Sequence, residues 1–318
     1  MVQLSKSLDL DRVRAAHERI RPYIHRPPVM TSEQLDAASG ASLFFKCENF
    51  QKIGAFKARG ATNAVFVLDE ATVGRGVATH SSGNHGAAVA RAARLRKIPA
   101  HIVMPSNSAK VKIRAVESYG AAVIFCEPTE EARETTCAEV IKKTGATLIH
   151  SFENEHVIAG QGTAALELLE DIPDLHLIMC PVGGGGLLSG TAIAAKSIRR
   201  QIKVIAVEPA NADDAAQSFR AGRRLVTEKK FTIADGLRTN VGERTFPIIQ
   251  RYVDDIVTVS EEAIVSAMRT IWETMKIVIE PSAALPYAAI VERVIDVNGK
   301  RVGIILTGGN VDLDALPW

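Results

Sequence analysis

The chain of 318 residues lacks the features that mark several classes of protein. It has only four cysteines, none of them in a Cys-x-x-Cys pair: Cys47, Cys126, Cys137 and Cys180. We expect buried free thiols in a reducing cytoplasm, because scattered cysteines suit neither a disulfide framework nor a zinc site. No apolar run reaches the roughly 20 residues that span a bilayer, and the N-terminus has no apolar signal-peptide core.

An excess of one charge is also missing. The net charge is +2, so no strong electrostatic field favours nucleic acid or an anionic membrane. Hydrophobic residues make up 47% and charged residues 23% of the chain, which is the composition of a globular protein. These absences predict a cytoplasmic protein whose partner is a small molecule rather than nucleic acid or a membrane.

What the sequence does contain is an alternation of short apolar segments and helical patterns. Strands are predicted at 77–80, 100–104, 122–126, 175–180, 204–207 and 302–306. Helices are predicted at 87–96, 109–119 and 130–143, and after Gly186. Strands that are apolar throughout and alternate with helices indicate parallel sheets covered on both faces, so we predict an α/β fold. The length allows one large domain or two ordinary ones.

Three loops that follow predicted strands are rich in Gly, Ser, Thr and Asn; they are 81–86, 183–186 and 307–310. In parallel sheets, ligands bind at the loops that follow the carboxyl ends of strands. We therefore expect these loops to build the functional site.

Lys57 has unusual neighbours for a lysine. Phe56 and Ala58 flank it, and Gly54 and Gly60 frame it. An amine that is partly removed from water has a lowered pKa and can act as a nucleophile toward carbonyl groups. The alternative is a lysine at the start of a helix whose head reaches solvent.

Four consecutive glycines, Gly183, Gly184, Gly185 and Gly186, lie between a predicted strand and a predicted helix. Their N–H groups and the helix dipole suit a phosphate, and a mere turn would not justify the chain entropy of four glycines. No lysine follows as in a P-loop, and the third glycine of a dinucleotide fingerprint is absent. An NAD(P)-type oxidoreductase is thus a weaker alternative, although Glu208 ends the next strand as a ribose-binding acid would.

Five segments occur in a fixed order along the chain: 54–60, 81–86, 159–163, 183–186 and 307–310. With these segments the chain resembles the fold-type-II pyridoxal-phosphate enzymes, in the branch of serine/threonine dehydratases, 3-hydroxyaspartate dehydratases and serine racemases. The resemblance implies two parallel-sheet domains of the tryptophan-synthase-β-like architecture, with the cofactor in the cleft between them. It implies a large domain of residues 1–74 and 149–318 and a small mobile domain of residues 75–148. It also implies a homodimer without a C-terminal regulatory domain.

The resemblance assigns roles around the cofactor, pyridoxal 5'-phosphate. Lys57 carries the cofactor as a Schiff base and later acts as general base, while Gly183 to Gly186 hold the phosphate. Phe56 packs against the ring, Asn84 bonds the ring hydroxyl, and Thr307 faces the ring nitrogen. A hydroxyl cannot keep that nitrogen protonated as a carboxylate would, which favours elimination over transamination.

Further roles concern the substrate and a metal. By resemblance, the substrate carboxylate is bound by the loop Ser81, Ser82, Gly83, Asn84 and His85. Ser82 is a second acid/base on the side of the substrate opposite Lys57. Arg133 lies near an anionic substrate, and a β-carboxylate suits its guanidinium. Phe152 departs from the asparagine of mammalian serine racemases. By resemblance, the metal, Mg²⁺ or Ca²⁺, is held by Glu208, Asp214 and the Ala212 carbonyl.

The sequence thus predicts a pyridoxal-phosphate-dependent lyase. It would convert a β-hydroxy amino acid, either serine, threonine or 3-hydroxyaspartate, to a 2-keto acid and ammonia. An amino-acid racemase with dehydratase side activity is the alternative within the same branch.

Overall fold

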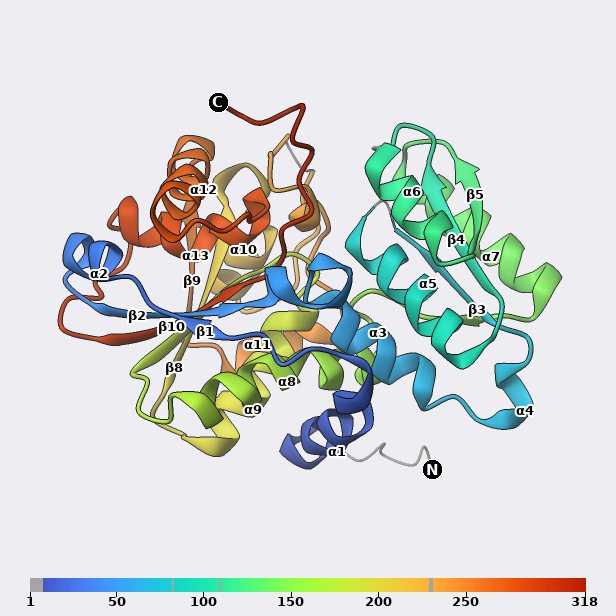
Figure 1. The fold of residues 1–318 in the computed structure, drawn as a ribbon, viewed down its shortest axis with the longest axis horizontal. Coiled ribbons are helices and arrows are strands. Elements are labelled where there is room, and N and C mark those ends of the chain that lie inside the picture. The colour runs from blue at the N-terminus through green and yellow to red at the C-terminus, as the bar shows by residue number, and fades with distance from the viewer. Residues whose placement is uncertain (1–7, 82, 109, 229–230) are drawn as a thin grey trace.

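The computed structural model of the protein describes residues 8–81, 83–108, 110–228 and 231–318. These residues form two sheets with helices around them (Figure 1). The larger sheet has six strands in the order β1 (Val29–Met30), β2 (Ser42–Cys47), β10 (Arg301–Leu306), β7 (Leu177–Pro181), β8 (Lys203–Pro209) and β9 (Asp255–Val259). The smaller has four, in the order β5 (Ala122–Cys126), β4 (Ala100–Pro105), β3 (Val77–His80) and β6 (Thr147–Leu148).

Both sheets are parallel except at one edge, so the predicted α/β class is confirmed. β2 runs parallel to β10, with Leu43 opposite Val302, and β3 runs parallel to β4, with Val77 opposite Ala100. Among the strands of the described residues, β1 alone is antiparallel, and it pairs Val29 with Lys46 of β2. The sequence did not reveal this edge, because a strand of two residues is too short to show a pattern.

The central strands of the larger sheet are buried on both faces, which explains their uniformly apolar sequence. On β7, Met179 belongs to one hydrophobic cluster and Ile178 to another, because successive side chains point to opposite faces. One face is covered by α12 (Glu261–Met275) and α13 (Pro281–Val291). The other is covered by α8 (Glu155–Asp171), α9 (Gly186–Ile198) and α11 (Thr245–Tyr252). The chain also forms α1 (Leu10–Ile20), α2 (Glu33–Ser39), α3 (Lys57–Phe66), α4 (Glu70–Val73) and α10 (Asp214–Ala221).

The smaller sheet forms a separate lobe, coloured cyan to green at the right of Figure 1. It carries α5 (Asn84–Arg96), α6 (Lys110–Ser118) and α7 (Glu130–Thr144). Its covering is thinner: β5 has no fully buried residue, and Cys137 is the buried residue of α7. The exact limits of the two domains stay a prediction.

The four cysteines are free; three are buried and Cys126 is partly exposed. Burial raises the pKa of the Cys47 thiol to about 12, so this side chain is unreactive at neutral pH. Among the described residues, no helix has both the length and the apolar character needed to cross a membrane.

Candidate active site

Lys57 is the first residue of α3, and its side chain lies between the two sheets, partly buried. Its Nζ donates to the Ser151 carbonyl at 3.3 Å and lies 5.1 Å from the centre of the Phe56 ring. Burial lowers the pKa of this amine to about 8, although the Glu280 carboxylate acts in the opposite direction. The sequence suggested either a desolvated amine or a lysine at the start of a helix. The structure combines the two, since Lys57 begins α3 and burial lowers the pKa of its amine.

A chain of three polar side chains joins the smaller lobe to the larger one beside Lys57. Asn84, at the start of α5, donates its amide N–H to Glu280 at 2.9 Å and accepts from Asn310 at 2.9 Å. Asn310 also donates to the Ile53 carbonyl, 2.8 Å away. The Asn84 amide nitrogen also lies 3.1 Å from the second Glu280 carboxylate oxygen. These partners fix which side of the Asn84 amide is oxygen.

Glu280 was not among the predicted site residues. It is 4% exposed, and burial together with the nearby Asp235 carboxylate raises its pKa to about 7. Asp235 in turn pairs with Lys112 of α6, so that a salt bridge also crosses between the lobes here. The available signal was an acid placed directly after the apolar run 277–279 and directly before Pro281.

Thr307 follows β10 and is 2% exposed. Its carbonyl accepts the N–H of Phe56 at 2.9 Å, which places it beside the start of α3. Its hydroxyl has no hydrogen-bond partner among the described residues. A buried hydroxyl without a partner is costly, so this atom fits a ligand acceptor such as a ring nitrogen.

The four glycines connect β7 to α9, and all are buried. Their N–H groups donate to no other residue that the structure describes. Gly185 has φ +88°, a left-handed conformation that favours glycine. Buried N–H groups at a helix start, without partners, form an anion site and fit a phosphate.

Phe152 shows why side chains are excluded from this loop. A Cβ on Gly184 would lie 2.2 Å from the Phe152 ring, and one on Gly186 would lie 3.0 Å from the Phe152 Cβ. Thr245 holds the loop from the other side by donating to the Gly184 carbonyl at 2.7 Å. Phe152 follows Ser151, which accepts from Lys57, so the glycine loop and the lysine are neighbours.

The predicted carboxylate-binding loop lies between β3 and α5. Ser82 lies outside the described residues. The Ser81 hydroxyl accepts the N–H of Gly83 at 3.2 Å, which shapes the turn before α5. His85 is 3% exposed, and its Nε2 lies 2.8 Å from the Ile149 carbonyl, so this nitrogen carries the proton. Burial, with Lys57 nearby, holds the pKa of His85 well below its usual value, so its ring is neutral.

Arg133 is on α7 and partly buried; its Nε donates to Thr129, 3.4 Å away. Burial, followed by the charge of Arg133, lowers the pKa of His80, and the rings of His80 and His150 lie 5.5 Å apart. Burial, His80 and Lys57 lower the pKa of His150 to about 4. Arg133 thus lies close enough to His80 for its charge to act on that ring, while its contact with a substrate stays a prediction.

The candidate metal ligands Glu208 and Asp214 are both completely buried. Glu208, near the end of β8, accepts the N–H groups of Ala215 and Ala216, while Asp214 accepts that of Val241 at 2.7 Å. Within the described ranges, no three His, Cys, Asp or Glu side chains form a metal cluster. Two carboxylates and the Ala212 carbonyl remain a suitable oxygen set for a hard cation.

A surface cavity of about 490 Å³ lies elsewhere, lined by side chains of α1, α8 and α9. It shares no lining residue with the lysine, the glycine loop or Thr307. The chemistry of the side chains, rather than the volume of this cavity, therefore locates the candidate site.

The architecture defines the class of the protein as a fold-type-II α/β enzyme. The structure of maize serine racemase superimposes with a TM-score of 0.95 at 48% identity, covering 96% of this chain and 94% of that one. Among curated relatives, beta-hydroxyaspartate dehydratase of Paracoccus denitrificans is 49% identical and covers 96% of both chains. Serine racemase of Arabidopsis thaliana is also 49% identical, covering 97% of this chain and 95% of its own.

The family model of the pyridoxal-phosphate dependent enzymes matches residues 20–308, and the chain belongs to this family. Membership implies pyridoxal phosphate as cofactor. The partnerless glycine N–H groups, the Thr307 hydroxyl and the Lys57 amine fit its phosphate, its ring nitrogen and its aldehyde. The alternative of a nucleotide-binding oxidoreductase is left without support.

Proposed function

We propose that the protein is a pyridoxal-phosphate-dependent dehydratase that acts on a β-hydroxy amino acid: serine, threonine or 3-hydroxyaspartate. The observation that carries this proposal is Lys57, whose amine has a pKa of about 8 beside Thr307 and the glycine loop. At neutral pH about a tenth of such amines are uncharged, compared with fewer than about one in a thousand ordinary lysines. An uncharged amine can bind the cofactor and accept a proton.

In this proposal, each group has one task. When bound, pyridoxal phosphate withdraws electrons from the substrate Cα and makes its C–H acidic. Lys57 Nζ takes this proton, and the β-hydroxyl leaves and is protonated to water. The resulting unsaturated amine takes up water and releases ammonia, which yields a 2-keto acid. Asn84, held by Glu280 and Asn310, would contact the ring hydroxyl of the bound cofactor.

Thr307 supports elimination. Its side chain is a neutral hydroxyl, which does not hold a ring nitrogen protonated as a carboxylate would. Beside such a neutral partner the cofactor, when bound, would withdraw electrons less strongly, which would favour loss of a β-hydroxyl over reprotonation of Cα. We infer that the enzyme dehydrates its substrate faster than it transaminates it.

The assay is keto acid formation from L- and D-serine, L-threonine and the diastereomers of 3-hydroxyaspartate. The relative from Paracoccus supports hydroxyaspartate, and Arg133 would then contact the β-carboxylate. We expect Arg133→Ala to lower kcat/KM for hydroxyaspartate by about tenfold or more and to change that for serine little. The purified holoenzyme should absorb in the visible region, and a visible band that persists in Lys57→Ala would refute the role of Lys57.

A racemase is the second candidate, because a serine racemase and a dehydratase have the same identity to this chain. Ser82 would be the second acid/base in that reaction. Chiral analysis of the remaining substrate measures racemisation directly. Ser82→Ala should abolish turnover of one enantiomer only, and equal loss for both would exclude this role.

We also propose that Glu208, Asp214 and the Ala212 carbonyl bind Mg²⁺ or Ca²⁺, and that the enzyme is a cytoplasmic homodimer. Dialysis against a chelator should lower the melting temperature of the wild type, and readded cation should restore it. Glu208→Gln should make stability insensitive to the cation. Sedimentation gives the oligomeric state.

A further inference from the structure

The segment 159–163 is one of the motifs that relate the chain to its family, and the site described above gives it no task. It lies on α8, which packs against α3 (Figure 1). Lys57 is the first residue of α3. The contact between these two helices therefore bears on the position of the lysine.

The start of α3 has no side-chain cap. The N–H of Ala58 donates to the Ala55 carbonyl at 3.2 Å, and the N–H of Arg59 donates to the Phe56 carbonyl at 2.9 Å. Both hydrogen bonds close tight turns. The next N–H, of Gly60, donates to the Gln161 side chain of α8 at 3.1 Å. The first turn of the lysine helix is thus completed by another helix.

Glycines allow the two backbones to touch. A Cβ on Gly160 would lie 2.6 Å from the Gly60 Cα, and one on Gly60 would lie 2.7 Å from the Val157 carbonyl. At this contact neither helix can shift along the other without a clash, because the groups in contact are backbone atoms.

Arg59 adds a second constraint, and its side chain is completely buried. Its Nε and Nη2 donate to Glu48 at 2.8 Å each. Its Nη1 and Nη2 donate to Glu167 at 2.8 and 2.7 Å, and its Nη1 also donates to Thr163 at 3.0 Å. These bonds use all five N–H groups of a guanidinium, which a lysine, with three, cannot replace.

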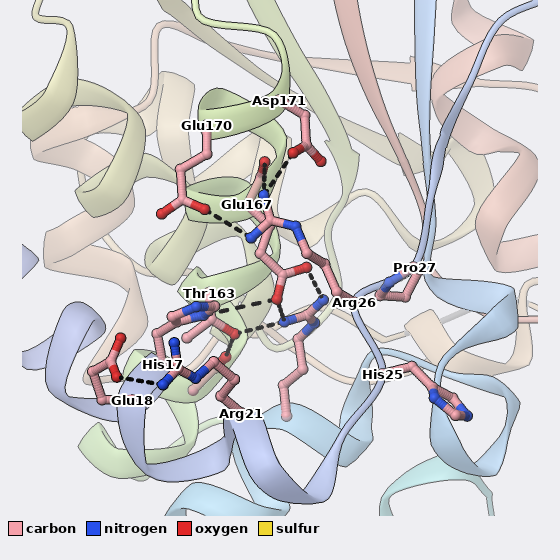
Figure 2. Close-up of polar contacts among 12 residues, drawn as sticks. His17, Glu18, Arg21, His25, Arg26, Pro27, Thr163, Glu167, Glu170 and Asp171 are labelled. Carbon is pink, nitrogen blue, oxygen red and sulfur yellow. Dashed lines mark hydrogen bonds and ion pairs between the residues drawn. The ribbon is translucent and has the colours of Figure 1, made fainter.

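Glu167 and Thr163 lie on α8, where Arg26 binds the same helix at Glu170 and Asp171 (Figure 2). Glu167 also pairs with Lys46 at 2.7 Å, and Lys46 donates to the Pro27 carbonyl at 2.6 Å. The two carboxylates Glu48 and Glu167 balance the charges of Arg59 and Lys46. These four side chains can therefore stay ionised in the interior with their hydrogen bonds satisfied.

Helix geometry connects Arg59 to Lys57. Successive residues turn by about 100°, so side chains two positions apart differ by about 200° and point to nearly opposite sides of α3. Holding Arg59 against Glu48 and α8 therefore sets the rotation of the helix that aims Lys57 between the lobes. An apolar side chain at position 59 would fill space without specifying this rotation.

We propose that Arg59, with Gln161, is a positioning residue for Lys57, and that the segment 159–163 exists to dock the lysine helix. This inference rests on the proposed role of Lys57. In the reconstituted holoenzyme, Arg59→Lys should lower kcat by about 100-fold and change KM by less than about threefold, because a displacement of about 1 Å has this effect on a reacting group. The visible circular dichroism of the bound cofactor should weaken as well, because the lysine holds the cofactor in a less fixed orientation.

A matched control separates positioning from stability. Ile264→Ala removes a buried side chain on the opposite face of the larger sheet and should lower the melting temperature without changing the cofactor spectrum. If Arg59→Lys has the kcat and spectrum of Ile264→Ala, the inference is wrong. If Arg59→Lys does not fold, Gln161→Leu decides: it removes only the bond to Gly60 and should lower kcat by about tenfold, and an unchanged kcat overturns the inference.

Failure of the proposed function gives a different result. Borohydride reduction of the wild-type holoenzyme, followed by peptide mapping, should place the cofactor on Lys57. Its absence there would refute the role of Lys57 itself. A wild type labelled at Lys57, with an Arg59→Lys variant that is equally labelled but slow, supports both proposals.

Discussion

Lys57 and Arg59 lie two residues apart at the start of one helix, and both are cations removed from water. Burial alone lowers the pKa of each. Around Arg59 the Glu48 and Glu167 carboxylates outweigh burial and raise its pKa, whereas Lys57 has a carbonyl partner and a more distant Glu280, and its pKa falls to about 8. The number of facing carboxylates, rather than depth, separates a structural cation from a reactive amine.

The largest effect should come from Lys57→Ala. Keto acid formation should fall on the order of 10⁴-fold, since both cofactor attachment and proton transfer are lost. Urea unfolding of the cofactor-free protein should show no loss of stability, because the change removes a desolvated amine with one weak partner. Lys203→Ala, at the exposed start of β8, is the control and should be fully active. If keto acid formation in Lys57→Ala falls by less than tenfold, Lys57 is not the reactive amine that the contrast with Arg59 assumes.

Glu167→Ala, in contrast to Lys57→Ala, should strongly lower the free energy of unfolding. It leaves the buried Arg59 and Lys46 without a shared carboxylate, which costs about 3–5 kcal/mol of unfolding free energy. Glu170→Ala, three positions along α8, breaks an exposed pair with Arg26 and should cost less than about 1 kcal/mol. Urea midpoints measure both. Similar losses of stability in the two variants would show that the ion pairs of Glu167 with Arg59 and Lys46 are no stronger than a surface ion pair.

The pKa of Lys57 predicts a pH dependence in the cofactor-free protein. Its folded value of about 8 lies below the ordinary 10.5, so the unfolded chain binds more protons between these values. Stability should therefore rise as pH increases through this range, by on the order of 2 kcal/mol after its partial exposure is discounted. Lys57→Met should remove this rise. A wild type and a variant with the same pH profile would place the amine in water.

Thr307→Val should have the smallest effect. In the cofactor-free protein it removes a buried hydroxyl without a partner among the described residues, so stability should increase by about 1 kcal/mol or less. In the holoenzyme, the same change should weaken cofactor binding, measured by fluorescence titration. If cofactor affinity is unchanged, the Thr307 hydroxyl does not face the ring.

Much of the fold could be predicted because its signals are local. The strands expected at 77–80 and 122–126 have the limits of β3 and β5. The helix expected from Ala87 begins earlier, at Asn84, because its N-cap is Gly83 and leaves no side-chain signal. The strand expected from Leu175 begins at Leu177, since an apolar run does not show where pairing starts.

The site was predictable only in part. Consecutive glycines and the apolar neighbours of Lys57 carry their chemistry within a few residues. Glu280 bonds Asn84 across 196 positions, and Arg59 reaches Glu167 across 108, so neither contact leaves a periodic pattern. In the sequence, Arg59 is only one residue of the segment 54–60, and nothing there indicates its partners.

The sequence by itself determined the α/β class and much of the alternation of strands and helices, and it indicated the residues proposed to hold a phosphate and an amine-bound cofactor. These depend on side-chain period and on glycine, which act between neighbours in the chain. Only the tertiary structure decided which buried charge is compensated: it placed two carboxylates around Arg59 and a single carbonyl against Lys57. A pKa depends on the groups that surround a side chain in space, so the same helix can hold one fixed cation and one reactive amine.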